Sequence, residues 1–361
     1  MFEIREINDK TEYDPLLISR QAPFTQAWFY GEWQETAGRK VRRFEIKKNS
    51  ETFGFFQVIK YPLLLSYNFL YIPHGPVIKN FGEEEGVNKN FIGAFREKLV
   101  QIAEEENAVF AKFDSIEDLD KAPRKLAGRL NAAGNPSASA GFDFYFRKVP
   151  AYAYKAAYFQ PKYEWLLDIE KSGEELLADM QSKCRYNIRL AESRGATVEI
   201  ISDNFERYFE IFYDLLSKTS ERGGFSLHSK SYYKNVFLNC EKNKNAFLAA
   251  AKYNEKIIAI NFILIFGDVA YFVFGGSNDE FKNLMAPHLA HWRGIAEAKN
   301  RSCKIYNFGG VAAGDDYKEF EGITRFKKGF GGRLFEYSDS WDLVLKTFWY
   351  RLYDFKKRLW G

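Results

Sequence analysis

The residues best suited to chemistry lie in glycine-containing segments near the C-terminal end of the chain. An aromatic strand ending in Gly275-Gly276 is followed by a helix-like stretch at 284–299, then by "KIYNFGGV" (304–311) and "FKKGFGG" (326–332). Strand ends and glycine-rich turns in this order gather around one cleft, with the Lys327-Lys328 pair at its lip. Such a cleft suits an enzyme that holds an acyl group next to an amine. A solvated lysine pair at a helix end is the alternative.

Charged residues elsewhere offer further candidates. Arg185 and Arg189 are four residues apart and share one helical face, which is either a phosphate-facing edge or a solvated surface. Asp114 ends a strand, where α/β folds collect functional side chains, and a purely structural carboxylate is the alternative. His288 and His291 have no acidic partners in register, so the sequence predicts no metal site.

The bulk composition limits the class of protein. A chain of 361 residues, 46% of them hydrophobic, is long enough for two domains with their own cores. A net charge of +4 permits contact with a phosphate-bearing partner but does not indicate a dedicated nucleic-acid binder. The 3 cysteines are isolated, which argues against disulfide and zinc frameworks. Because "MFEIREINDK" has no signal-peptide pattern, we expect a cytoplasmic protein.

The hydrophobic pattern predicts two halves with a similar order of elements. In the first half it predicts helices at 26–37, 83–106 and 118–133, and strands at 41–47, 53–60, 68–77, 108–114 and 142–149. In the second half it predicts strands at 163–169, 197–201 and 304–308, helices at 205–220, 231–240 and 284–299, and an antiparallel hairpin region at 246–274. Gly267-Asp268 marks the turn of that hairpin. Ser172 and Glu175 form a capping box, and the helix they open carries Leu176, Met180, Cys184 and Ile188 on one stripe.

Helix, helix, antiparallel hairpin, helix and strand is the order expected of an N-acyltransferase-type domain. We therefore predict an α/β (α+β) protein with two tandem GNAT-like domains, residues 1–155 and 156–335, whose sheets are mixed and largely antiparallel. Residues 336–361 are predicted to form an amphipathic helix that packs back on the first domain. Its stripe is Trp341, Val344, Phe348, Leu352, Phe355 and Leu359, with basic and aromatic residues around it that also suit a membrane surface.

A series of segments in one order carries a resemblance to a known family. They are QAWFYGEW (26–33), IPHGP (72–76), FAKFD (110–114), KCRYNIRLAESRGATV (183–198), TSERGGFSLHSKSYY (219–233), FGGSNDEFKNLMAPHLAHW (274–292), YNFGGV (306–311) and FKKGFGG (326–332). Together they resemble the Fem family of peptidoglycan bridge-forming aminoacyltransferases, in the compact FemX type without a coiled-coil arm. His74, Asn307 and Ser226 depart from the arginine, aspartate and tyrosine common in the family, which concerns substrate details rather than class.

The resemblance implies transfer of an amino acid from aminoacyl-tRNA, as co-substrate and without a cofactor, to the stem peptide of a UDP-linked or lipid-linked cell-wall precursor. It implies that Lys327 contacts the aminoacyl end and that Asp114 is the carboxylate favoured as general base. It places Arg222 at the precursor diphosphate and Tyr271 in the peptide channel. The remaining candidate substrate contacts are Arg185, Arg189, Trp33, His228 and Lys328. We also expect a monomer with peripheral contact to the inner membrane surface.

Three alternatives stay open from the sequence alone. An acyl-CoA-dependent N-acetyltransferase would share the fold, but its Q/R-x-x-G-x-G/A fingerprint is incomplete here because Phe326 occupies the first position of "FKKGFG". A relative that acylates another acceptor is compatible with the same fold. A non-enzymatic module that binds nucleic acid or a membrane surface is disfavoured by the mild net charge.

Overall fold

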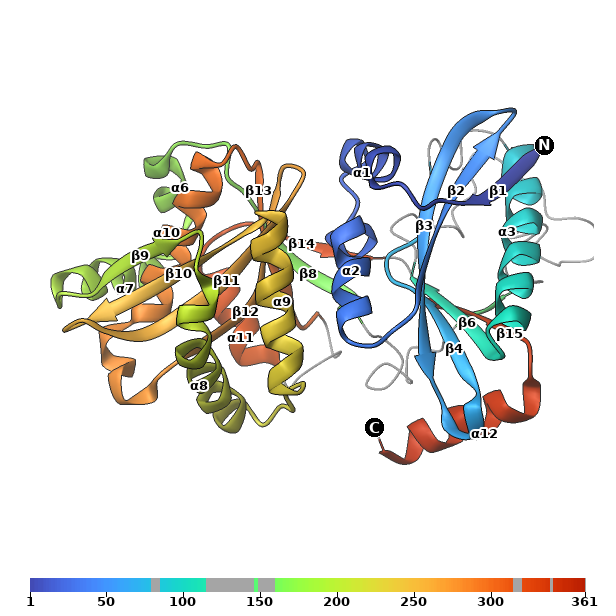
Figure 1. Cartoon of the computed structure of the whole chain (residues 1–361). Coiled ribbons are helices and arrows are strands. Elements are labelled where there is room, and N and C mark those ends of the chain that lie inside the picture. The colour runs from blue at the N-terminus through green and yellow to red at the C-terminus, as the bar shows by residue number, and fades with distance from the viewer. Residues whose placement is uncertain (79–84, 115–145, 149–159, 314–319, 338–339, 361) are drawn as a thin grey trace, which may run out of the picture. The chain divides into compact units, whose positions relative to one another are not determined.

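The chain divides into two compact units. The structure is a computed structural model that describes residues 1–78, 85–114, 146–148, 160–313, 320–337 and 340–360. One unit comprises Met1–Lys162 and Tyr337–Gly361, and the other comprises Tyr163–Glu336 (Figure 1). Each unit is a mixed sheet with helices on both faces, as the sequence predicts. The helix expected at 118–133 and most of the strand expected at 142–149 lie outside the described residues.

The sheet of the first unit is built mainly from antiparallel pairs. Its order is β1–β2–β3–β4–β6–β15–β7, with β5 beside β3, and β4–β6 is a parallel pair. The strands are β1 (Phe2–Glu6), β2 (Val41–Lys48), β3 (Glu51–Pro62), β4 (Asn68–Ile72), β5 (Val77–Ile78), β6 (Ala108–Asp114), β7 (Arg147–Lys148) and β15 (Ser340–Val344). The bounds of β6 match the predicted strand, and β15 comes from the far end of the chain.

Helices cover both faces of this first sheet. Helix α3 (Glu85–Glu105) lies on one face, where Phe95 packs on Phe56 and Phe113. The other face meets Tyr350, which packs on Phe110. The helical elements on that second face and at the strand ends are α1 (Lys10–Ser19), η1 (Phe24–Gln26), α2 (Trp28–Thr36), η2 (Leu64–Ser66) and α12 (Thr347–Trp360).

The sheet of the second unit has the order β14–β8–β13–β12–β11–β10–β9, with β12 and β13 parallel. Its strands are β8 (Tyr163–Asp168), β9 (Thr197–Ile201), β10 (Ala246–Tyr253), β11 (Lys256–Phe266), β12 (Val269–Ser277), β13 (Ile305–Gly310) and β14 (Arg333–Glu336). Its helical elements are α6 (Gly173–Asp179), α7 (Ser182–Ser193), α8 (Phe205–Gly223), α9 (Lys230–Asn243), η5 (Asp279–Leu284), α10 (Ala286–Asn300) and α11 (Glu321–Lys328). Helix α10 packs on β10, β11 and α7, whereas α8 packs on β11 and β12.

Two glycines explain how the aromatic strands of this unit are placed. Gly267 has a φ of +61° at the turn between β11 and β12, so the predicted hairpin at Gly267-Asp268 is confirmed. At Gly276 a Cβ would lie 2.4 Å from the backbone of Leu215-Leu216, because α8 crosses β12 there at close range. Gly276 therefore serves the packing of a helix on the sheet.

The helix predicted after Ser172 is interrupted. The capping box itself is confirmed, since the Glu175 amide donates to Ser172 Oγ at 3.2 Å and the Ser172 amide donates to Glu175 Oε2 at 2.8 Å. The single long helix is wrong, because α6 stops before Met180 and α7 begins anew at Ser182. The amide of Gln181 donates to the Gly329 carbonyl at 2.9 Å, so a long-range contact holds the break open.

The C-terminal tail also differs from its prediction. Trp341 and Val344 belong to strand β15, which pairs with β6 and β7, and not to a helix. Helix α12 starts only at Thr347. The predicted start of the helix was wrong because the spacing of Trp341 and Val344 fits a helix as well as a short strand. Pairing with β6 makes this segment a strand.

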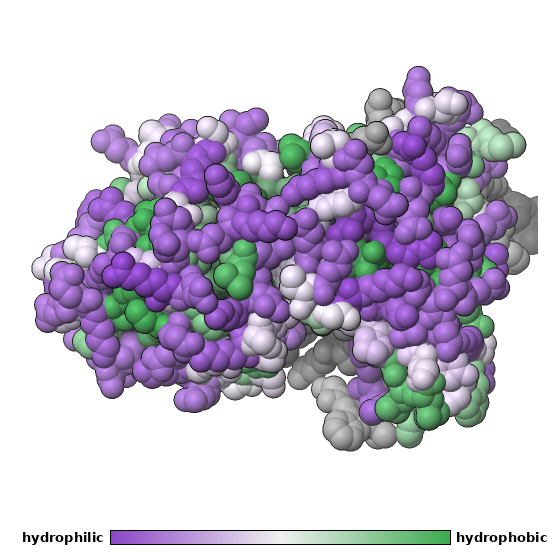
Figure 2. Space-filling view, viewed as in Figure 1, coloured by the Kyte–Doolittle hydropathy of each residue, from purple (hydrophilic) through white to green (hydrophobic). Residues whose placement is uncertain are grey.

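The apolar stripe of α12 points the opposite way from the prediction. Phe348, Leu352 and Phe355 are exposed, while Tyr350 is buried against Phe110. Figure 2 shows apolar side chains gathered at the lower right, where α12 runs in Figure 1. Among the described helices, none combines the length and apolarity needed to cross a bilayer.

Candidate active site

Lys327 is buried in the second unit. Helix α11 turns Thr324 and Lys327 inward, one helical turn apart, and the Lys327 side chain is only 6% exposed. Lys327 Nζ donates to the Gly310 carbonyl at 2.6 Å, and Thr324 Oγ1 accepts from the Ala312 amide at 2.8 Å. Helix α11 is thereby tied to the chain that leaves β13.

A glycine turn leaves room beside the ammonium group. Gly309 has a φ of +75°, and a Cβ there would lie 3.9 Å from Lys327 Nζ. The Gly309 amide donates to Asn307 Oδ1 at 2.7 Å, and Asn307 Nδ2 donates to Glu164 Oε2 at 2.7 Å. An aspartate in place of Asn307 would set a second carboxylate against Glu164, so the asparagine found here fits its acidic neighbour.

Burial affects the protonation of Lys327 more than the neighbouring carboxylate does. Burial lowers the pKa of Lys327 to about 8, and the carboxylate of Glu164 opposes this shift. Burial also lowers the pKa of His291 to about 3, with a further contribution from Lys327, so this imidazole is neutral at pH 7. The site thus holds an ammonium group that is mostly charged at neutral pH and that titrates just above it.

Two other candidates lie on elements next to Lys327. Tyr271 of β12 is buried and stands opposite Asn307 in the β12–β13 register. Lys328 is exposed, and its Nζ lies 5.3 Å from the ring centre of Trp165 on β8. The structure therefore brings Tyr271, Lys327 and Lys328 to the neighbouring strands β8, β13 and β12.

The two arginines of α7 have separate environments. The guanidinium of Arg185 donates to the carbonyls of Leu177 at 3.2 Å and Ala178 at 3.1 Å, and also to that of Met180. These are the last carbonyls of α6, so Arg185 caps the C-terminus of that helix. Arg189 is exposed on the outer side of α7. The spacing of Arg185 and Arg189 predicts one phosphate-facing edge. In the structure Arg185 has a structural role and only Arg189 is exposed.

Arg222 and His228 flank the connection between α8 and α9. Arg222 lies in the last turn of α8 and forms an ion pair with Asp279 at 2.8 Å, with side chains 39% and 58% exposed. It also donates to the Ser277 carbonyl at 3.4 Å, at the end of β12. His228 is exposed, with its ring centre 4.3 Å from that of Tyr232. Arg222 therefore lies at the end of β12 that is farther from Tyr271.

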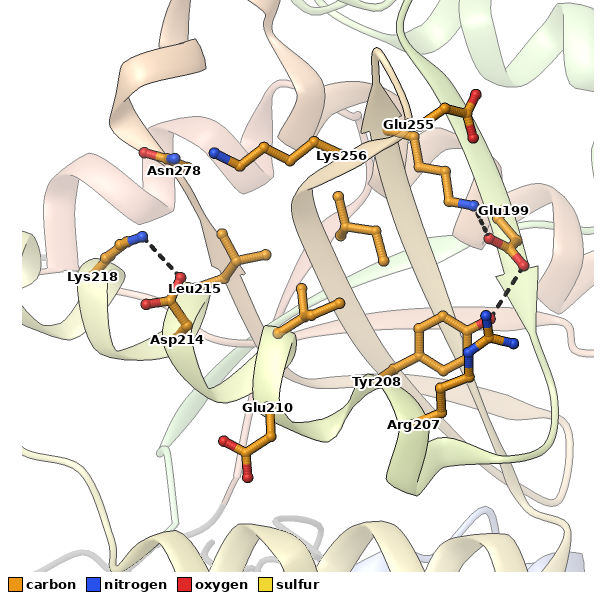
Figure 3. A pocket seen from close by; sticks show the side chains of 13 residues that line it. Glu199, Arg207, Tyr208, Glu210, Asp214, Leu215, Lys218, Glu255, Lys256 and Asn278 are labelled. Atoms are coloured by element: carbon orange, nitrogen blue, oxygen red, sulfur yellow. Dashed lines mark hydrogen bonds and ion pairs between the residues drawn. The ribbon is translucent and has the colours of Figure 1, made fainter.

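A groove of about 660 Å³ lies along α8 and the β10–β11 hairpin (Figure 3). Several of its polar groups contact one another: Lys218 pairs with Asp214 at 2.8 Å, and the hydroxyl of Tyr208 and the ammonium of Lys252 both contact Glu199. None of the residues predicted from the sequence lines it. We assign the groove no part in the chemistry.

Asp114 belongs to a buried polar network in the first unit. Its side chain is 2% exposed, and its two oxygens accept hydrogen bonds from the hydroxyls of Tyr71 and Ser340. Burial raises the pKa of Asp114, although these hydroxyls and Lys112 oppose the shift. Because Tyr71 lies on β4 and Ser340 on β15, the carboxylate ties together the strands on both sides of β6.

Trp33 also lies inside the first unit. Its side chain is 2% exposed and packs with Tyr30 at a centroid distance of 5.2 Å and with Phe24 at 6.4 Å. The indole stabilises the packing of α2 inside the unit, and it would reach a substrate only if these rings rearranged.

Sequence reasoning missed Glu164. It lies on β8 and is 8% exposed. Its carboxylate accepts a hydrogen bond from Asn307 and interacts electrostatically with Lys327. A buried acidic residue inside the apolar strand "YEWLLD" was the available signal, since such residues are rarely buried without a partner.

Each unit contains a mixed, largely antiparallel sheet flanked by helices, and similar folds occur in solved acyltransferase-type structures. A tandem GNAT protein from the clavulanic acid biosynthesis pathway is 10% identical, with a TM-score of 0.52, and the match covers 95% of this chain and 98% of that one. The predicted α/β fold with two GNAT-like domains is thus confirmed.

Residues 9–257 and 239–358 match the FemAB family, and the chain belongs to that family. The crystal structure of FemX is similar over 98% of this chain and 100% of that one, with 21% identity and a TM-score of 0.78. A lipid II:glycine glycyltransferase of Staphylococcus aureus is 24% identical over 89% of this chain and 88% of its own length. The resemblance to the Fem family is therefore confirmed.

Proposed function

We propose that this protein is an aminoacyltransferase that moves an amino acid from aminoacyl-tRNA to the stem peptide of a peptidoglycan precursor. The observation that carries the proposal is Lys327, a buried ammonium group beside the Gly309-Gly310 turn. Membership of the FemAB family and the similarity to a glycyltransferase that acts on lipid II support it.

The chemistry needs little beyond positioning and charge. The free amine of the stem peptide attacks the ester carbonyl of the aminoacyl-tRNA, forming a C–N bond as the C–O bond to the ribose breaks. The amine loses a proton, and the tRNA hydroxyl leaves with one. The Lys327 ammonium stabilises the negative charge on the carbonyl oxygen in the tetrahedral state. Its pKa of about 8 keeps most of that charge in place at pH 7.

The distance between two candidates suits an extended substrate. The Phe272 carbonyl borders the turn at Gly309 beside Lys327, whereas Arg222 meets Ser277. Phe272 and Ser277 are five residues apart along β12, which corresponds to roughly 17 Å. We propose that Arg222 binds the precursor diphosphate, to which a guanidinium is well suited, while the peptide runs along β12 toward Lys327.

The acceptor is either the soluble UDP-linked precursor or its lipid-linked form, and both meet aminoacyl-tRNA in the cytoplasm. We propose that the protein acts there as a monomer, in peripheral contact with the membrane when the acceptor is lipid-linked. No cofactor is required, because the aminoacyl ester is already activated.

The alternative of an acyl-CoA donor is disfavoured by the "FKKGFG" segment. A CoA pyrophosphate cradle uses free backbone amides at the start of a helix. Here the segment ends helix α11, and the amides of Gly329, Phe330 and Gly331 already donate to the carbonyls of Arg325, Lys327 and Lys328. These amides already form hydrogen bonds at the end of α11, so they do not form a pyrophosphate cradle.

A donor test separates the two proposals. The purified protein is offered, in separate reactions, a UDP-linked muropeptide, a lipid-linked muropeptide or an unrelated amine, each with either aminoacyl-tRNA or acyl-CoA, and products are identified by mass spectrometry. We expect a product carrying an additional amino acid with aminoacyl-tRNA alone. Transfer from acyl-CoA, or transfer only to amines unrelated to muropeptides, would overturn the proposal.

A substitution tests the role of Arg222. Because removing a charged hydrogen-bond partner costs about 1.5–3 kcal/mol, Arg222→Ala should raise the KM for the precursor by about 10- to 100-fold and leave the KM for tRNA unchanged. Lys218→Ala on the same helix, which removes the ion pair with Asp214, is the matched control. Equal weakening of both substrates would make Arg222 a structural residue.

A further inference from the structure

Helix α12 presents an apolar stripe to solvent. Phe348, Leu352 and Phe355 recur at helical spacing, and they are 72%, 48% and 61% exposed. Large hydrophobic residues scattered singly on a surface are common, but a contiguous stripe on one helix face indicates a contact surface. This stripe therefore requires a partner.

The apolar surface continues onto the neighbouring 3₁₀ turn η2. Leu64 and Leu65 are 67% and 74% exposed at its tip. Tyr67 follows directly, and its ring centre lies 4.7 Å from that of Trp349 in α12. The Ser66 carbonyl and Lys346 Nζ both hydrogen-bond to Asn107, which fixes η2 beside the start of α12. We call this combined surface the α12–η2 face; its apolar members are Leu64, Leu65, Phe348, Leu352 and Phe355.

The outward orientation of the stripe is fixed by what α12 buries. The hydroxyl of Tyr350 donates to Asp342 at 2.6 Å, and the rings of Tyr350 and Tyr353 pack on Phe110 at 5.2 and 4.8 Å. Asp342 in turn pairs with Lys112 at 2.7 Å. The Tyr350 hydroxyl thus supplies Asp342 with a hydrogen-bond donor, which phenylalanine or leucine at that position would not provide.

Basic residues border the α12–η2 face. Arg351 and Lys356 are exposed on α12 between the apolar positions, and Lys346 directly precedes the helix. The acidic residue of this helix, Asp354, is 27% exposed and lies 3.8 Å from Arg147. An apolar stripe with cations at its margin matches a bilayer surface that contains anionic lipids.

We infer that the α12–η2 face docks the protein on anionic membrane surfaces, with the apolar side chains in the interfacial region and the cations against phosphate groups. A second copy of the chain fits less well. A two-fold contact would place the face against itself and bring Arg351 and Lys356 toward their own copies. The inference rests on the proposed function for the membrane contact and names the surface that makes it, and it can be tested separately because docking requires neither substrate.

The test is co-sedimentation of the full-length protein with vesicles, without tRNA or precursor. Vesicles of phosphatidylcholine with phosphatidylglycerol should bind the protein, and pure phosphatidylcholine should bind it far less. Phe348→Ser combined with Leu352→Ser should weaken binding at least about tenfold. Arg351→Gln combined with Lys356→Gln should weaken it about thirtyfold at low salt.

Leu238→Ser is the matched control, because Leu238 is 41% exposed on α9 of the other unit. It should leave vesicle binding unchanged, and all variants should keep transfer to a soluble UDP-linked acceptor. Absence of binding to anionic vesicles, or equal loss in the Leu238→Ser variant, overturns the inference. Self-association that disappears in the Phe348→Ser, Leu352→Ser variant, without vesicle binding, assigns the face to a second copy. If the unmodified protein transfers nothing to the soluble UDP-linked acceptor, that result bears on the proposed function alone.

Discussion

Each unit buries a lysine beside its central strands, and the two charges are compensated differently. Lys112 has the Asp342 carboxylate at 2.7 Å, and these side chains are 2% and 3% exposed. Lys327 donates instead to a backbone carbonyl at 2.6 Å, while the carboxylate of Glu164 accepts from Asn307. A buried cation with a full counter-charge is part of the scaffold, whereas one held by a dipole retains charge to offer a reacting group. Burial alone does not distinguish the two.

The largest expected effect is on the scaffold lysine. Lys112→Met leaves Asp342 buried without its cation, so it should lower the free energy of unfolding of the first unit by about 3–5 kcal/mol. Urea unfolding of the full chain measures this loss. Adding Asp342→Leu removes the stranded carboxylate and should recover most of the stability. An equal loss in the single and double variants would contradict the comparison.

Lys327→Met should spare the fold and lose the chemistry. We expect turnover to fall about 10²- to 10³-fold, the cost of a lost oxyanion donor, in a single-turnover assay at saturating substrate. The KM for the precursor should change little. Stability at pH 7 should hold or rise, because a desolvated cation is removed. Lys304→Met provides a control, since Lys304 is exposed near Asp268 at the other end of β13. Unchanged turnover in the Lys327 variant would remove this residue from the site.

The pH dependence of the transfer rate tests whether the charge on Lys327 takes part in the reaction. Since burial lowers the pKa of Lys327 to about 8, the rate should fall about tenfold per pH unit above that value as the ammonium is lost. Lys327→Arg should abolish this limb because arginine stays protonated. A rate that rises through pH 8 would instead identify the neutral amine as the base. Stability has the opposite trend: between pH 8 and 10.5 the unfolded chain binds more protons at this lysine, so the free energy of unfolding rises with pH.

Asp114→Asn should have the smallest effect. An asparagine oxygen can accept from one of the two hydroxyls that contact Asp114, and its amide can donate to the other, so stability should change by less than about 1 kcal/mol. Turnover within about threefold of the original would leave Asp114 with a structural role. A loss comparable to that of Lys327→Met would make it the general base.

Local signals predicted much of the fold. Strands β6 and β9 have the predicted bounds, and the capping box at Ser172 and the turn at Gly267 are present. These features depend on residues close together in sequence, namely alternating apolar positions, a cap and a glycine with positive φ. Lys327 was singled out by the glycine-rich segment that follows it together with the family resemblance, and its role in the chemistry stays a prediction.

The errors arose where distant parts of the chain decide the outcome. The break at Met180 depends on the Gly329 carbonyl, and β15 depends on β6. The face of α12 that turns inward is chosen by Asp342, which selects tyrosine over the more apolar phenylalanine. Glu164 reaches Lys327 across the sheet from a strand far earlier in the chain. The spacing of apolar residues along the sequence indicates which face of a helix or strand is buried. It carries no information on pairings between distant segments.

The position of β15 sets an order of assembly during synthesis. The second unit, Tyr163–Glu336, is continuous and leaves the ribosome complete. The first unit still lacks strand β15, which lies between β6 and β7, until residues 340–344 have emerged. Its sheet therefore waits with the edge of β6 open, and open edges pair readily with other chains. A premature stop before Ser340 should consequently yield a protein whose second unit is folded and whose first unit aggregates.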